Sequence, residues 1–91
     1  MRVAKSVHDL IGHTPVIEIT QFPLPKGVRV FAKLEYFNPG GSIKDRLGQE
    51  SLRDALETGK LKAGGTSIEP TAGNTGIGLA LAAMGKNINV I

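Results

Sequence analysis

The chain has 91 residues, a formal net charge of +3 and an apolar share of 41%, which is typical of a folded globular protein and not of a disordered segment. It contains no cysteine, which excludes disulfides, thiolate zinc sites and a catalytic thiol, and which fits a reducing cytosol. Lysines and arginines alternate with acidic residues and aromatic residues are few, so nucleic-acid binding is not favoured. No apolar run is long enough to span a bilayer, and the first residues lack the apolar core of a signal peptide. We therefore expect a cytoplasmic protein with neither a nucleic-acid nor a membrane partner.

The first half of the chain predicts one short helix and two strands. Residues 6–11 favour a helix that Ser6 caps and Gly12 ends. Residues 15–19 alternate partly between apolar and polar and predict a strand. Residues 28–35 are rich in β-branched and apolar side chains and give the clearest strand signal.

The second half predicts two helices and two further strands. Ser42 and Asp45 have the spacing of a capping box, and a helix with an apolar side follows until Gly59. The other predicted elements are a strand at 66–69, an apolar helix at 76–84 and a strand at 87–91.

This alternation of strands and helices predicts an α/β fold with an open, twisted, mostly parallel sheet and flanking helices. The helix at 76–84 is apolar nearly all round, which implies burial on several sides. A final strand at 87–91 would leave a sheet edge open. We therefore interpret residues 1–91 as the N-terminal portion of a larger enzyme, without a separate second domain.

Lys44 lies where a glycine-rich turn, residues 38–41, becomes a helix. Glycines let other groups approach closely, and the positive end of a helix opposes protonation of an ammonium group. Such a lysine is a candidate nucleophile or Schiff-base former. The alternative is a lysine whose stem is packed and whose head is in water, and this segment alone does not decide between them.

A second turn, residues 69–76, follows a predicted strand and opens the next helix. Successive backbone amides in such a turn can hold a phosphate or a carboxylate. Alternatively, Asn74 or Thr75 only caps the helix. The glycine spacing excludes a dinucleotide fingerprint, and Gly85-Lys86-Asn87 is not a nucleotide P-loop.

Together, the two turns place an amine and an anion cradle at the carboxyl ends of strands, where open α/β sheets bind ligands. This combination resembles the cysteine synthase and cystathionine β-synthase family of pyridoxal-phosphate (PLP) enzymes, which has the tryptophan-synthase-β-like fold (fold type II). The resemblance extends over nearly the whole chain. It rests on Gly12-His13-Thr14-Pro15, Lys33-Leu34-Glu35, Asn38-Pro39, Gly41-Ser42-Ile43-Lys44-Asp45-Arg46, Leu61-Lys62, Ile68-Glu69-Pro70-Thr71 and Gly73-Asn74-Thr75-Gly76-Ile77-Gly78-Leu79-Ala80.

The resemblance implies that Lys44 is the catalytic lysine that forms the Schiff base with PLP, and that Asn74 also binds the cofactor. It further implies that a loop grips the carboxylate of the amino-acid substrate; its residues are Thr71, Ala72, Gly73, Asn74 and Thr75. Many family members have serine where this chain has Ala72, so a hydroxyl is lost while the backbone amide is kept. In the family, the loop that binds the PLP phosphate lies beyond the segment that corresponds to residues 1–91. These 91 residues alone are therefore expected to bind PLP poorly. No metal is implied, because His8 and His13 lack neighbouring ligands.

The implied reaction is a β-replacement on a serine-type substrate in cysteine biosynthesis. Cysteine synthase would combine O-acetylserine with sulfide, and cystathionine β-synthase would use homocysteine. For either reaction, the resemblance implies a parent enzyme that is a homodimer. Two alternatives remain, a non-catalytic module that binds an anion or nucleotide and an inactive truncation. A serine/threonine dehydratase is less favoured, because Gly73-Asn74 is followed by Thr75-Gly76 and not by His-Ala.

Overall fold

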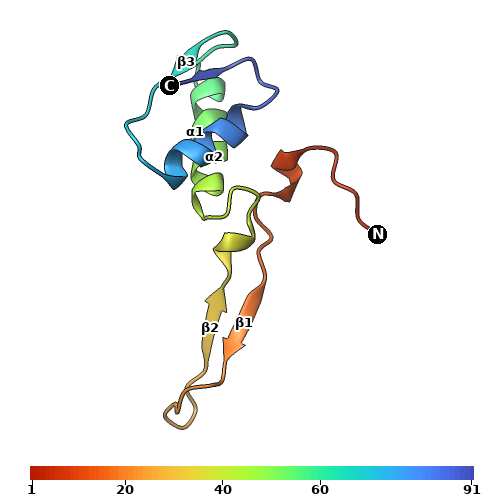
Figure 1. Ribbon diagram of the computed structural model, residues 1–91, viewed down its shortest axis with the longest axis vertical. Helices are drawn as coiled ribbons and strands as arrows, with labels where there is room; N and C mark the ends of the chain where they lie inside the picture. Colours follow the sequence, from red (N-terminus) through yellow and green to blue (C-terminus); the bar gives the residue numbers. More distant parts are fainter.

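The computed structural model describes all residues, 1–91, as an elongated molecule with a hairpin at one end and two helices at the other (Figure 1). A short N-terminal 3₁₀ helix, η1, contacts the second α-helix, and His8 Nε2 lies 3.2 Å from the carbonyl oxygen of Ala82. In chain order the elements are η1 (Val7–Leu10), β1 (Val16–Ile19), β2 (Val30–Lys33), η2 (Glu35–Phe37), α1 (Lys44–Glu57), β3 (Thr66–Ser67), α2 (Asn74–Ala83) and β4 (Asn89–Val90).

The hairpin is formed by β1 and β2, which pair antiparallel with Val16 opposite Lys33 and Ile19 opposite Val30. Strand β2 is shorter than the predicted strand at 28–35. The chain turns into η2 at Glu35, where successive amides donate to carbonyls three residues earlier. Most side chains of the two strands are exposed, so the hairpin contributes little to the core.

The predicted α/β character is correct, but these residues do not form one mostly parallel sheet. Strands β3 and β4 are parallel, with Thr66 opposite Asn89 and Ser67 opposite Val90, and α2 connects them. Strands β1 and β2 form a separate antiparallel pair, because a short loop joins them and a parallel pairing needs a long crossover.

The helix starts differ from the predictions in their capping. Helix α1 begins at Lys44, but Ser42 and Asp45 do not form a capping box. Ser42 Oγ accepts from the Lys44 amide at 3.1 Å, whereas Asp45 reaches back to the turn before the helix. The helix at 6–11 is a 3₁₀ helix, and the Ser6 side chain makes no capping bond. Helix α2 begins at Asn74, two residues earlier than predicted.

The core lies between α1 and α2, where Leu52, Leu79, Ala82 and Ala83 are buried together. The burial of α2 is one-sided, because Ile77 remains 47% exposed. Within these 91 residues α2 is therefore not buried on several sides, and the expected burial there stays a prediction for a larger protein. No helix in the chain combines the length and the apolar character that a membrane crossing requires.

Candidate active site

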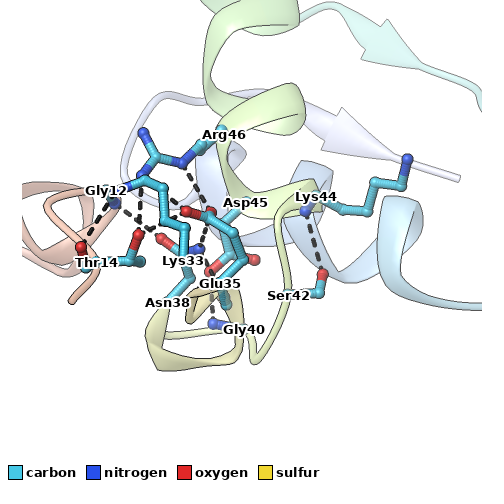
Figure 2. A network of polar contacts seen from close by, with 10 residues as sticks. All are labelled: Gly12, Thr14, Lys33, Glu35, Asn38, Gly40, Ser42, Lys44, Asp45 and Arg46. Carbon is cyan, nitrogen blue, oxygen red and sulfur yellow. Dashed lines mark hydrogen bonds and ion pairs between the residues drawn. The ribbon is translucent and has the colours of Figure 1, made fainter. Parts of the chain in front are cut away.

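Lys44 is the first residue of α1, and its side chain is exposed. Its Nζ makes neither a hydrogen bond nor an ion pair within the chain. Figure 2 shows the lysine pointing away from a dense group of polar side chains on the other side of the helix start. The structure thus presents a primary amine that no carboxylate has neutralised.

The loop at 71–75 leads into α2 and leaves several amides free. Gly73 N–H donates to Thr71 Oγ1 at 3.2 Å, but the amides of Ala72, Asn74 and Thr75 have no acceptor within the chain. Residues 71–74 are exposed and Thr75 is half-buried. Free amides at the start of a helix favour an anionic group, since the helix dipole is positive at this end.

Two glycines allow the start of α1, with Lys44, to contact the first turns of α2. A methyl group added at Gly78 would lie 2.6 Å from the carbonyl carbon of Lys44, and one at Gly48 would lie 2.7 Å from the amide nitrogen of Leu79. Only hydrogen fits at both positions, so the backbones of α1 and α2 touch there. Gly78 lies one helical turn beyond Asn74, and Lys44 is therefore held close to the start of α2.

A polar network fixes the other side of the α1 start (Figure 2). Arg46 donates to both oxygens of Glu35, with Nε 2.8 Å from Oε2 and a terminal nitrogen 3.1 Å from Oε1. Thr14 Oγ1 donates to Glu35 Oε1 at 2.5 Å, and Asn38 Nδ2 donates to Oε2 at 2.9 Å. The N-terminal segment, the end of β2 and the start of α1 are joined through this one carboxylate.

The same network holds Glu35 in its charged form. Hydrogen bonds from Arg46 and Thr14 lower the pKa of Glu35 from 4.5 to about 2, and they outweigh the opposite effect of desolvation. The Glu35 side chain is only 17% exposed, so water has little access to these hydrogen bonds. The ion pair is therefore part of the framework of the site and is not a titrating group near neutral pH.

The sequence predicts this framework only in part. The sequence favours a structural ion pair for Arg46, as observed. For Glu35 it leaves two roles open, a support for the turn and the solvated carboxylate that is usual at a strand end. The bonds from Thr14 and Asn38 have no such signal, nor does the bond from Gly40 N–H to Asp45 Oδ2 at 2.6 Å. The bond from Thr14 spans 21 residues, whereas the other two span only three and five residues around the turn.

A pocket of about 350 Å³ lies elsewhere, against α1, β3 and the start of α2. Thr75 is the one predicted site residue that lines it, and Lys44 does not. Half of its lining residues are apolar, including Leu52 and Leu79 of the core. The pocket adjoins the core between the helices, and the free amine lies outside it.

Known proteins resemble this chain in both sequence and fold. Residues 7–91 match the family described as pyridoxal-phosphate dependent enzyme. The chain is 56% identical over its full length to an O-acetylserine dependent cystathionine β-synthase of Bacillus subtilis and 47% identical to a cysteine synthase of Helicobacter pylori, in each case covering 30% of the relative. A crystal structure of cystathionine β-synthase from Bacillus anthracis superposes with a TM-score of 0.79 and 67% identity, over 99% of this chain and 34% of that one.

The chain belongs to the family of pyridoxal-phosphate dependent enzymes. The family resemblance predicted from the sequence is thereby confirmed, and so is the cofactor of the family. The chain spans about 30% of the length of the curated relatives it matches.

The residues of this chain can hold two groups of PLP or of a substrate bound beside it, an aldehyde and an anion. Lys44 offers an uncommitted amine for an aldehyde, and the free amides at 72–75 suit an anionic group. The individual roles of Lys44, Asn74 and the loop remain predictions, because similarity between whole chains assigns no function to a single residue.

Proposed function

We propose that this chain carries the lysine-bearing part of an enzyme that uses PLP for β-replacement on a serine-type amino acid. The observation that carries the proposal is the contact at Gly78, which joins an exposed, unpaired Lys44 to a helix start with free amides. A non-catalytic anion-binding module would use the amides but would not need the lysine. The family membership supports the enzymatic alternative.

In this proposal Lys44 holds the cofactor through its ε-amine, and Asn74 contributes a further polar contact. The bound cofactor supplies an electron sink for the negative charge that develops at the substrate α-carbon. Amides of the 71–75 loop bind the substrate carboxylate and orient the bond from the α-carbon to its hydrogen. Lys44 would also accept the proton from the substrate α-carbon as general base. A leaving group departs from the β-carbon, and a sulfur nucleophile adds there.

Two nucleophiles are supported by different relatives. The name cysteine synthase, carried by a 47% identical relative, supports sulfide and the synthesis of cysteine. The name cystathionine β-synthase, carried by the 56% and 67% identical relatives, supports homocysteine. The name of the 56% identical relative includes O-acetylserine, which supports acetate as the leaving group. Ala72 lacks the hydroxyl that many family members have at this position. This difference does not favour sulfide or homocysteine, because the backbone amide of Ala72 is available in either reaction.

The proposal extends to the organisation of the protein. Residues 1–91 would be its N-terminal portion, and the parallel pair of β3 and β4 would be part of a larger, mostly parallel sheet. The coverage of about 30% of the relatives supports this division. A homodimeric enzyme located in the cytoplasm is the corresponding expectation.

The direct test is to reduce the full-length protein with borohydride in the presence of PLP and to map the modified peptide. We expect one pyridoxyl group, on Lys44, and none in a Lys44→Ala variant. A pyridoxyl group on a different lysine, or none in the native protein, would contradict the role of Lys44.

Product analysis with O-acetylserine then decides the nucleophile. Sulfide and homocysteine are offered separately and together at equal concentration, and cysteine and cystathionine are quantified. Formation of neither product would contradict the assignment to sulfur chemistry, while the lysine assignment would stand on the borohydride result.

A further inference from the structure

Asp45, the residue after Lys44, is fully buried, with 0% of its surface exposed. It is the largest side chain in the chain that is buried to this degree. Its Oδ2 accepts the Gly40 amide at 2.6 Å, but its Oδ1 has no hydrogen-bond partner. Burying a carboxylate is costly unless it is paired, so this half-satisfied group needs an explanation beyond packing.

The surroundings of Asp45 connect it to the turn that precedes Lys44. The turn begins with a hydrogen bond of 2.8 Å from Gly41 N–H to the carbonyl of Asn38, and Gly41 has a φ of +85° that favours glycine. Gly40 lies against Asp45 so closely that a methyl group there would be 3.0 Å from the carboxyl carbon. Asp45 therefore holds the middle of the turn from inside the molecule.

The side chains of Asp45 and Lys44 point to different sides of the helix start. Figure 2 shows Asp45 and Arg46 directed into the polar network and Lys44 directed away from it. The backbone of Lys44 is held on another side by Gly78. Asp45 thus fixes the backbone that carries the amine without contacting the amine itself, as no bond joins the two side chains.

We propose that Asp45 is a positioning residue for Lys44, which acts by accepting the Gly40 amide and thereby fixes the turn from which the lysine projects. This inference rests on the proposed role of Lys44 as the lysine that binds PLP. The bond holds the turn that leads into α1, which would present the Lys44 amine to the cofactor in one orientation.

The test compares Asp45→Asn, which keeps an oxygen acceptor and the shape, with Asp45→Ala, which removes both. In the full-length protein, two quantities are measured at saturating PLP. These are the total PLP bound after gel filtration and the fraction of it that borohydride fixes to Lys44. We expect Asp45→Asn to retain this fraction within about twofold and Asp45→Ala to lower it about tenfold, because a misplaced reacting group costs one to two orders of magnitude.

Two controls separate positioning from a general loss of structure. Leu52→Ala opens a cavity in the core between α1 and α2, away from the turn, and should lower the melting temperature without lowering the linked fraction. Should Asp45→Ala not fold, Gly40→Ala displaces the carboxylate without removing it and should lower the linked fraction in the same way.

The outcomes distinguish this inference from the proposed function. Equal linked fractions in native protein and in Asp45→Ala or Gly40→Ala would overturn the positioning role, and so would an Asn variant as defective as the Ala variant. A parallel fall of linked fraction and melting temperature in Leu52→Ala would also overturn it. Absence of any label on Lys44 in the native protein would instead overturn the proposed function.

Discussion

Two arginines, one in the hairpin and one at the junction between the hairpin and the helices, each donate two hydrogen bonds to a glutamate, and the two pairs differ in their surroundings. In the hairpin, Arg29 pairs with Glu18, and 67% and 39% of their side chains are exposed. Near Lys44, Arg46 pairs with Glu35, and the exposed fractions are 39% and 17%. Only the second glutamate has additional donors, from Thr14 and Asn38. Similar geometry thus serves a water-exposed strand pair in one place and a junction of three chain segments in the other.

This difference follows from what each pair connects. Glu18 lies on β1 and Arg29 directly precedes β2, and the hairpin already holds these two strands together. Arg46 and Glu35 join an α-helix to a strand end, and Thr14 ties a third segment to them. Loss of an exposed pair changes stability little, because water replaces the bonds and salt screens the charges.

The largest effect is expected from Gly78→Ala, which tests how tightly the helical end is packed. The added methyl group meets the Lys44 backbone, and overpacking of this kind costs about 1–3 kcal/mol. Denaturant unfolding of the full-length protein should show this loss. Ala80→Ser adds one heavy atom on the exposed face of the same helix and should change little. A Gly78→Ala protein as stable as the control would mean that the helices do not touch there.

A second effect compares the two arginines directly. Arg46→Gln leaves a mostly buried Glu35 with fewer donors, whereas Arg29→Gln leaves Glu18 in contact with water. We expect the fall in melting temperature to be several times larger for Arg46→Gln. Equal falls in melting temperature for the two variants would show that the Arg46–Glu35 pair, with its additional donors, stabilises the protein no more than the exposed Arg29–Glu18 pair.

The pH dependence of stability gives a third test. Since its neighbours lower the pKa of Glu35 from 4.5 to about 2, its contribution is complete above about pH 5 and is lost as the pH falls towards 2. The Glu35→Gln protein should be less stable at pH 7, and its stability should fall less steeply between about pH 5 and 2. Parallel pH profiles for native protein and variant would contradict the lowered pKa.

The smallest expected effect is that of salt. At about 1 M salt the Debye length is roughly 3 Å, and exposed pairs are screened more than buried ones. The difference in melting temperature between native protein and Arg29→Gln should vanish under these conditions, while that for Arg46→Gln should largely persist. Equal salt sensitivity of the two differences would contradict the contrast in burial.

The sequence by itself determined the local features of this protein. Glycine, proline and asparagine at 38–41 required a turn, and the predicted helix follows it, although it begins at Lys44, one residue later than a cap at Ser42 implies. The motifs at residues 41–46 and 73–80 resembled those of the family, and the comparison confirmed that resemblance. These features depend on neighbouring residues, and for this reason a linear pattern contains them.

Only the tertiary structure decided how the elements are joined. It paired residues 16–19 with 30–33 instead of placing all strands in one sheet, and it gave Asp45 a turn to hold instead of a capping box. It also brought Gly78 against Lys44 and Thr14 against Glu35. Such contacts depend on shape and burial between distant segments, which no residue spacing along the chain specifies.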